Sequence, residues 1–265
     1  MAAPWFEDEI TQDLQPMLPG LRVEVVAEID STNSELMRRA RDGRNAPVLL
    51  VAERQTAGRG RLGRPWQSAQ DAGEPPSLTF SLGLSLAPRD WSGLSLAVGA
   101  SVAESLDPSQ AAGVKLKWPN DLWKEERKLA GILIETALLQ PDASDRYLVI
   151  GIGINVGPRE AVGMNTPPAW LKEWRPDATP GEVLCEIVVP LVRDVLLFND
   201  RGFVPFAARF AERDVLRGRD VRLSDGTEGH CEGVGWGGEL LVRTAAGVQP
   251  ISSAEVSVRP QSGPR

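Results

Sequence analysis

The chain has 265 residues, of which 42% are apolar and 25% are charged, and its formal net charge is −7. These values are ordinary for a globular protein and exclude long disorder, collagen-like repeats and a disulfide-rich scaffold. The negative charge argues against broad nucleic-acid binding, which needs a basic face, so any anion site must be local. No apolar run approaches the roughly 20 residues of a membrane span, and residues 1–12 lack the features of an export signal, which predicts a cytoplasmic protein.

The first half of the chain alternates strand and helix patterns. Thr32 and Glu35 have the spacing of a capping box, which predicts that a helix begins at Thr32 and stops at Gly43. Alternating or short apolar runs predict strands, and small and apolar residues at helical spacing predict a second helix. The predicted strands are residues 21–29, 48–52 and 78–86, and the second helix is 93–106.

The second half begins with three more predicted strands, residues 114–118, 129–139 and 147–156, whose short connections favour antiparallel pairing. Thr179, Pro180 and Glu182 form a strong helix start, which predicts a helix to about Asn199. A second helix is predicted over residues 204–214.

From Gly218 onward, short alternating strands are separated by Asp-Gly and Gly-Gly turns, a texture typical of a small β-barrel. The sequence therefore predicts an α+β fold. Residues 1–216 form a main domain with a mixed, mostly antiparallel sheet and packed helices, and residues 217–265 form a small all-β domain.

The sequence offers few residues for acid–base or metal chemistry. The one histidine, His230, stands in a turn-like stretch near the C-terminus, so a site built on several histidines is excluded and a Ser-His-Asp triad is a poor prediction. The two cysteines, Cys185 and Cys231, are most simply reduced, partly buried thiols. Four of the five lysines fall within 14 residues, and for any one of them a solvated hairpin is favoured over a binding role. These lysines are Lys115, Lys117, Lys124 and Lys128.

A loop after the strand at 48–52 concentrates positive charge. Residues 58–63, GRGRLG, match the GxGxxG pattern of dinucleotide sites, but no helix follows directly, so a Rossmann site is not predicted. Four arginines fall within 11 residues that contain no acid, namely Arg54, Arg59, Arg61 and Arg64. Two interpretations explain the loop equally well: it closes on an anion such as a nucleotide phosphate, or it is a solvated basic surface. Single-stranded RNA binding is a third interpretation.

Two further segments present polar groups at strand ends. In residues 117–121, KWPND, a strand gives way to a turn, and Asp121 is a candidate to orient or deprotonate an incoming amine, although Asn and Asp are also common in structural turns. Gly131 and the glycines of residues 151–157 let a ligand or another backbone approach closely. Asn155 is a candidate ribose or phosphate ligand, with a capped strand end as the favoured alternative.

Together these segments resemble the biotin protein ligase family. The resemblance covers about residues 20–260, and its longest motif is highly specific. The matching stretches are 30–33 (DSTN), 55–66 (QTAGRGRLGRPW), 117–121 (KWPND), 127–132 (RKLAGI) and 151–155 (GIGIN). The C-terminal segment is similar to the family's SH3-like barrel, although Ala254 stands where a glycine is usual. The resemblance thus implies a biotin/lipoyl ligase-like catalytic domain followed by an SH3-like barrel.

The resemblance also implies a two-step reaction. Biotin and ATP with Mg²⁺ form biotinyl-5′-AMP and pyrophosphate, and a lysine of the biotin carboxyl carrier domain of acetyl-CoA carboxylase or a related carboxylase then takes the biotinyl group. The implied catalytic residues are Lys128, Arg59 and Asp121. The implied biotin-binding residues are Ser31, Thr32, Asn33, Gln55, Gly58, Arg59, Gly60, Arg61, Lys128 and Gly131. The implied ATP or adenylate ligands are Arg61, Arg64, Trp66, Asn120, Lys128 and Asn155.

This chemistry needs no histidine base, because the biotin carboxylate is already a nucleophile and catalysis reduces to positioning and charge neutralisation. Arg59 and Lys128 are expected at the carboxylate and α-phosphate. Arg61 and Arg64 are expected in a lid that keeps the acyl-adenylate from water. Trp66 is expected either to stack on adenine or to be a plain core residue.

The remaining expectations concern partners. Mg²⁺ is expected to be held largely by the ATP phosphates, with Asp121 as a candidate ligand, and no redox cofactor is expected. Only about 20 residues precede the first strand, so the resemblance implies a ligase without a DNA-binding domain, with neither DNA nor membrane as a partner. The choice between monomer and homodimer stays open. A lipoate or octanoate transferase and a non-catalytic RNA- or nucleotide-binding module are the competing interpretations.

Overall fold

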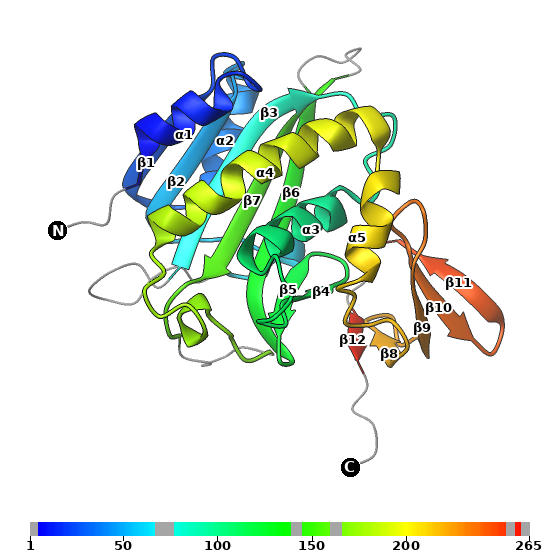
Figure 1. The fold of residues 1–265 in the computed structure, drawn as a ribbon. Helices are drawn as coiled ribbons and strands as arrows, with labels where there is room; N and C mark the ends of the chain where they lie inside the picture. The colour runs from blue at the N-terminus through cyan, green and yellow to red at the C-terminus, as the bar shows by residue number, and fades with distance from the viewer. Residues whose placement is uncertain (1–4, 67–76, 139–144, 160–165, 253–257, 261–265) are drawn as a thin grey trace.

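A seven-stranded sheet forms the centre of the computed structural model, which describes residues 5–66, 77–138, 145–159, 166–252 and 258–260 (Figure 1). The strand order is β1-β2-β3-β7-β6-β5-β4. Only β1 and β2 pair in parallel, and every other neighbouring pair is antiparallel, which confirms the predicted mixed, mostly antiparallel sheet. The strands are β1 (Arg22–Ile29), β2 (Val48–Gln55), β3 (Ser77–Leu86), β4 (Lys115–Lys117), β5 (Asp121–Lys124), β6 (Arg127–Leu138) and β7 (Arg146–Asn155).

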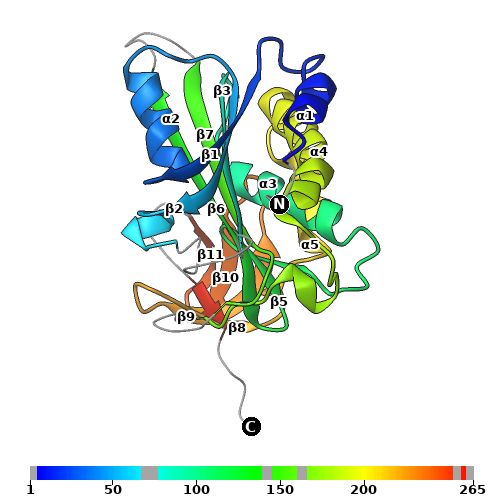
Figure 2. The same ribbon diagram turned by 90° about the vertical axis from the view of Figure 1, so that its left-hand side faces the viewer.

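Helices cover both faces of this sheet, as Figure 2 shows. On one face lie α1 (Glu7–Leu14), α3 (Leu94–Leu106) and α4 (Pro180–Arg201), and the main hydrophobic core fills the space beneath them. On the other face α2 (Thr32–Arg41) covers a smaller core that includes Leu36, Leu50 and Val149. Because side chains alternate along a strand, β3 directs Leu78 and Phe80 into the main core and leaves Thr79 and Ser81 on the α2 face. A polar site can therefore form on that face.

The helix starts follow from local side chains. At α4 the structure confirms the prediction: Thr179 is the N-cap, Pro180 is the first helical residue, and Glu182 completes a capping box. Helix α2 begins at Thr32 as predicted, but its capping residue is not Thr32. The N-cap is Ser31, whose hydroxyl accepts a hydrogen bond from the Ser34 amide. Glu35 instead forms ion pairs with Arg38 and Arg39.

The C-terminal part is a second, five-stranded sheet in the order β11-β10-β9-β8-β12, which agrees with the predicted SH3-like domain. Its strands are β8 (Asp220–Leu223), β9 (Glu228–Val234), β10 (Leu240–Thr244), β11 (Gly247–Ile251) and β12 (Val258–Pro260). Ala254 lies outside the described residues. The predicted helix at 204–214 is wrong in length: a 3₁₀ turn, Val204–Phe206, precedes a five-residue helix, α5 (Ala207–Ala211). The second sheet starts at Asp220, and the domain boundary at 216/217 stays a prediction.

Two elements were not predicted. Helix α1 is short and strongly acidic, yet it buries Ile10 and Leu14 in the core. Strand β5 follows the Asn120-Asp121 turn and pairs with β4 on one side and β6 on the other.

The hairpin that carries the lysine cluster is only partly solvated. Lys117 and Lys124 are each 8% exposed, and their ammonium groups lie over the rings of Trp123 and Trp174. The solvated-hairpin interpretation is therefore wrong for these two lysines, because they are buried and their ammonium groups face aromatic rings instead of water.

Outside the site, the remaining chemical candidates take ordinary places. His230 is an exposed residue of β9 whose ring nitrogen lies 3.0 Å from Asp220, and both cysteines are free thiols, as predicted. No helix in the described part of the chain has the length and hydrophobicity needed to cross a membrane.

Candidate active site

A cavity of about 300 Å³ opens on the α2 face of the sheet. Its walls are the N-terminus of α2, the β4–β5 turn and residues 58–66, a segment called here the arginine loop. Its floor is formed by β6 and β7. All the predicted site residues except Gly58 line it. These are Ser31, Thr32, Asn33, Gln55, Arg59, Gly60, Arg61, Arg64, Trp66, Asn120, Asp121, Lys128, Gly131 and Asn155. Their roles stay predictions, but the fold brings them together from five separate stretches of sequence.

One end of the cavity is a network of neutral hydrogen-bonding groups around Thr32. The amide and the hydroxyl of Thr32 both contact Gln55 Oε1, at 2.8 and 3.2 Å. Ser81 Oγ lies 2.7 Å from the Thr32 hydroxyl and 2.6 Å from Asn33 Oδ1. Because the N-cap conformation of Ser31 turns this segment toward the sheet, polar groups at the start of α2 reach the cavity. Such an end suits a neutral polar ligand.

Glycines on β6 and β7 form the cavity floor. A Cβ atom at Gly151 would lie 2.1 Å from Asn33 Oδ1, and one at Gly153 would lie 2.3 Å from the Trp66 ring. Gly131 is paired directly with Gly153 across the two strands. Side chains at positions 151 and 153 would displace Asn33 and Trp66, so these two glycines allow both residues to lie against the sheet.

The arginine loop is closed at its base by main-chain hydrogen bonds. The Trp66 amide donates to the Gly58 carbonyl at 2.8 Å, and the Gly60 amide donates to the Arg64 carbonyl at 2.7 Å. A Cβ atom at Gly58 would lie 2.3 Å from the Trp66 carbonyl oxygen, so only glycine permits this closure. At the apex, Leu62 has φ 56°, in the left-handed region, and is 57% exposed.

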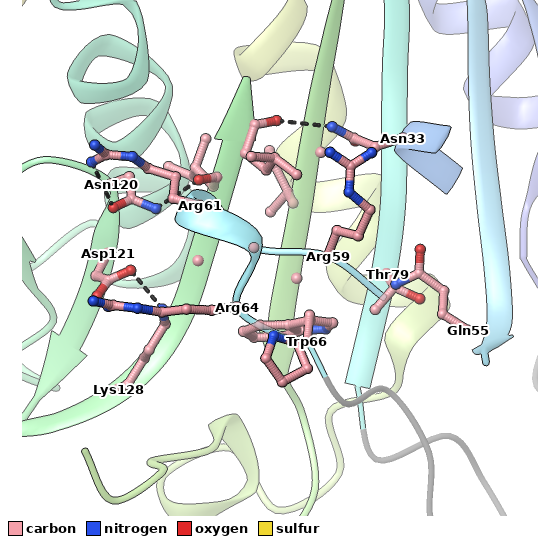
Figure 3. A pocket seen from close by; sticks show the side chains of 18 of the residues that line it. Asn33, Gln55, Arg59, Arg61, Arg64, Trp66, Thr79, Asn120, Asp121 and Lys128 are labelled. Atoms are coloured by element: carbon pink, nitrogen blue, oxygen red, sulfur yellow. Dashed lines mark hydrogen bonds and ion pairs between the residues drawn. The ribbon is translucent and has the colours of Figure 1, made fainter. Parts of the chain in front are cut away.

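The arginines of this loop point in opposite directions (Figure 3). Arg59 extends toward Asn33, where it forms a 2.8 Å ion pair with Glu135 and donates to Ser34 Oγ at 3.2 Å. Arg61 and Arg64 extend toward the β4–β5 turn, and Arg61 Nη1 lies 3.5 Å from Asn120 Oδ1. Burial lowers the pKa of Arg61, against the attraction of Asp121, and the nearby Arg64 lowers it further. Arg54 belongs to neither group, because it pairs with Glu28.

Lys128 is held at the far end from the α2 network. Its Nζ forms a 2.6 Å ion pair with Asp121 Oδ1, and its main chain is fixed by the carbonyl of Pro167 and the amide of Ala169. Asn155 donates its amide hydrogens to the carbonyls of Lys128 and Ala169, both at 3.0 Å. Asn155 thus fixes the backbone that carries Lys128, which agrees with the favoured capped-strand-end interpretation.

Arg159 is a cavity residue that sequence reasoning missed. Its Nη1 donates to Asn155 Oδ1 at 2.6 Å, and its guanidinium lies 5.5 Å from the centre of the Trp66 ring. Lys128 Nζ lies 5.9 Å from the same ring. Burial lowers the pKa of Arg159 to about 10, because the charged guanidinium loses hydration inside the cavity. The sequence feature that could have pointed to Arg159 is its position only four residues after Asn155, which was already a predicted site residue. Thr79 was missed as well, although the alternation of β3 places it on this face.

The cavity combines a neutral end with a strongly cationic end. Asp121 is the single carboxylate among the described lining residues. Arg61, Arg64, Lys128 and Arg159 form the cationic end, whereas the fifth lining cation, Arg59, lies toward Asn33 and is paired with Glu135. The described residues contain no group of three or more histidine, cysteine or acidic side chains that could hold a metal by itself. One carboxylate beside several cations fits a Mg²⁺ held mainly by the phosphates of a substrate.

Comparisons with known proteins agree with this fold. Residues 25–155 match the Biotin/lipoate A/B protein ligase family. The chain is 34% identical over 247 residues to the "Bifunctional ligase/repressor BirA" of Escherichia coli, a match that spans 91% of this chain and 75% of that protein. It is 42% identical over 142 residues to the "Biotin--[acetyl-CoA-carboxylase] ligase" of Mycobacterium tuberculosis, covering 51% of this chain and 49% of that one.

A solved structure gives the same result. "Biotin protein ligase from Aquifex aeolicus in complex with biotin and ATP" matches with a TM-score of 0.74 and 30% identity, covering 90% of this chain and 99% of that chain. Fold and cavity together define a ligase domain of the biotin/lipoate class. Within that class, the chain belongs to the biotin protein ligase family.

Proposed function

We propose that this protein is an ATP-dependent biotin protein ligase, which forms biotinyl-5′-AMP and transfers biotin to a lysine of the biotin carboxyl carrier domain of acetyl-CoA carboxylase or a related carboxylase. The observation that carries the proposal is the division of one cavity into a neutral hydrogen-bonding end and a cationic end. An uncharged ureido ring suits the first end, and a carboxylate beside an α-phosphate suits the second. The relatives that match most of the chain support the same substrates.

In the first step, a biotin carboxylate oxygen attacks the α-phosphorus of ATP, and the bond from that phosphorus to the bridging oxygen of pyrophosphate breaks. No proton transfer is needed, so the protein contributes orientation and positive charge. Lys128 Nζ is held beside Asp121 at the cationic end, and we assign to it the contact with the carboxylate and α-phosphate oxygens. Arg61 and Arg64, which extend to the same end of the cavity, are assigned to the phosphates.

In the second step, the amine of the carrier lysine attacks the acyl carbon of the adenylate, and the bond from that carbon to the AMP oxygen breaks. The amine must lose a proton, and Asp121 is the carboxylate at the cationic end that can orient the ammonium or accept that proton. The arginine loop lies over the cavity at this stage and limits the access of water to the mixed anhydride.

The other partners follow from the same chemistry. A Mg²⁺ held by the ATP phosphates would neutralise their charge, and Asp121 is the side chain that fits it as a protein ligand. Trp66, which lies on the glycine floor between Lys128 and Arg159, is assigned to the wall that separates the two ends. A cytoplasmic location stays a prediction.

The test is pyrophosphate release from ATP and Mg²⁺ with biotin, with lipoate and with no acid, followed by addition of a purified biotin carrier domain. We expect release with biotin, and then a biotin-sized mass increase on one carrier lysine. Release with lipoate alone would keep the fold and overturn the substrate. Release with neither acid would leave the arginine loop as part of a binding module.

A further inference from the structure

Glu135 on β6 joins the arginine loop to the polar end of the cavity, although it does not line the cavity itself. Its Oε1 forms the 2.8 Å ion pair with Arg59, and its Oε2 accepts a hydrogen bond from Asn33 Nδ2 at 3.0 Å. The Glu135 side chain is 22% exposed, whereas that of Arg59 is 47% exposed. One half-buried carboxylate therefore holds two segments that lie far apart in the sequence.

This carboxylate is one link of a continuous hydrogen-bond network. From Glu135 the network continues through Asn33 to Ser81 Oγ, from Ser81 to Thr32, and from Thr32 to Gln55. Gln55 and Arg59 are the two ends of the segment that leads from β2 into the arginine loop. Both ends of that segment are thus fixed to the same group of residues, one by a neutral amide and the other by an ion pair.

The direction of Arg59 supports an anchoring role. Its guanidinium points away from Arg61 and Arg64 and contacts Glu135 and Ser34 (Figure 3). This ion pair keeps the Arg59 guanidinium at the polar end of the cavity, away from the end to which the phosphates are assigned, so the geometry argues against the catalytic role that the resemblance implies for Arg59. With Arg59 fixed, the loop leaves the anchor at a defined point, and Arg61 and Arg64 are directed to the opposite end of the cavity.

We propose that Glu135 is a positioning residue for the ligase reaction, which anchors the arginine loop through Arg59 and orients Asn33 at the same time. The inference rests on the proposed function for its kinetic consequence, but the anchoring itself is a property of the ligand-free protein. Loss of the anchor leaves Lys128 and Asp121, which lie on β6 and β5 outside the loop, in place and makes closure of the loop over biotin less favourable.

The central variant is Glu135→Gln, which keeps the shape of the side chain and removes its charge. We expect the KM for biotin to rise about tenfold in the pyrophosphate-release assay, with kcat changed by less than about twofold, because a charge-assisted hydrogen bond is replaced by a neutral one. Arg59→Gln should give the same split, and the double variant should be no worse than either single variant, because both remove one interaction.

Glu24→Gln is the matched control. Glu24 forms an ion pair with Arg39 of the same 2.8 Å length and has a similar exposure of 32%, but it lies on β1 outside the cavity. We expect wild-type kinetic constants from this variant. A general loss of stability would affect it and Glu135→Gln alike, whereas loss of the anchor affects only the latter.

Hydrogen exchange of the ligand-free protein tests the anchor without any assumption about the reaction. We expect amides of residues 56–62 to exchange at least about fivefold faster in Glu135→Gln and in Arg59→Gln than in the wild type or in Glu24→Gln. Because the Arg59 side chain is half exposed, replacing it with glutamine leaves no cavity in the hydrophobic core.

Two outcomes would overturn the proposal. Unchanged exchange in both variants would show that the ion pair does not hold the loop. A lower KM for ATP in Glu135→Gln would show that Arg59, once released, binds phosphate. If the wild-type protein itself releases no pyrophosphate with biotin, the proposed function fails, and the exchange result still decides the anchor.

Discussion

The two ends of the cavity differ in how completely their polar groups are satisfied before any ligand binds. At the neutral end, Thr32, Asn33 and Gln55 are linked to one another and to Ser81 by hydrogen bonds. At the cationic end, the positive side chains face a single carboxylate, Asp121, among the described lining residues. The first end is preorganised by the fold, and the second keeps a surplus of positive charge that an anion can neutralise. The same cavity therefore holds one region that stabilises the fold and one that costs stability in favour of binding.

The largest effect should come from the residue at the centre of the cationic end. We expect Lys128→Ala to reduce the rate of adenylate formation by about 10³-fold, the magnitude seen when a preorganised charge or donor at a reacting centre is removed. Pyrophosphate release with saturating biotin measures it. Lys115→Ala, on β4 and outside the cavity, is the control and should retain wild-type activity. A loss smaller than about tenfold would show that the arginines, and not Lys128, supply most of the positive charge that stabilises the transition state.

The boundary between the two ends is tested at Gly153. In Gly153→Ala the new methyl group would lie 2.3 Å from the Trp66 ring, so the ring must move. We expect the KM for biotin to rise by about 10- to 100-fold, because small displacements of positioning groups have effects of this order. Pyrophosphate release over a range of biotin concentrations measures this constant.

The added change Trp66→Leu gives the second half of this test. A smaller side chain at position 66 removes the clash with the new methyl group, so the double variant should recover part of the loss relative to Gly153→Ala alone. If the double variant is worse than both single variants, Trp66 contributes binding contacts that outweigh the clash.

The residues of the cavity show how much of the site can be predicted from the sequence. The glycines of residues 151–155 and the arginine loop predicted a site, and family resemblance linked them to Lys128 and Asp121. Local patterns predicted most strands and α4, because those elements carry apolar runs, alternation or capping signals. Helix α1 was missed because eight residues with three acids in the first turn carry only two buried apolar positions.

The residues that sequence reasoning missed owe their roles to tertiary contacts. Arg159 becomes a cavity residue by packing on Trp66, which lies in a distant part of the chain. The partner of Arg59 is Glu135, 76 positions away, and nothing near Arg59 in the sequence indicates it. Lys117 and Lys124 were expected in solvent because the rings that cover them follow from strand pairing and from the turn that ends at Trp174.

A smaller effect is expected at the loop that connects the two ends. We expect Arg61→Gly to keep adenylate synthesis within about tenfold of the wild type and to release more of the intermediate into solution, because the arginine that joins the loop to Asn120 is lost. Biotinylation of a bystander protein such as serum albumin, compared with labelling of the carrier domain, measures the leak. Equal and mild effects of Arg61→Gly and Lys128→Ala would contradict the assignment of the loop as a lid.

The smallest effect concerns stability, and its sign should differ between the two ends. Thr32→Val removes hydrogen bonds to Ser81 and Gln55, and we expect the free energy of unfolding to fall by about 1–2 kcal/mol. Arg159→Met should instead raise it by about 1 kcal/mol at about pH 7.5, because the folded-state pKa of Arg159, about 10, lies below its ordinary value.

The sign follows from linkage. Arg159 has a lower pKa in the folded protein than in the unfolded chain, so its charge is less favourable in the folded state. The charge therefore lowers the free energy of unfolding at every pH below about 10. This penalty decreases as the pH rises above about 10 toward the ordinary pKa of arginine. The gain in Arg159→Met should therefore shrink at alkaline pH, whereas the loss in Thr32→Val should not. Urea denaturation at about pH 7.5 and about pH 10.5 measures both. If Arg159→Met destabilises the protein near neutral pH, its hydrogen bond to Asn155 outweighs the cost of burying the charge, and the cationic end is as well satisfied as the neutral one.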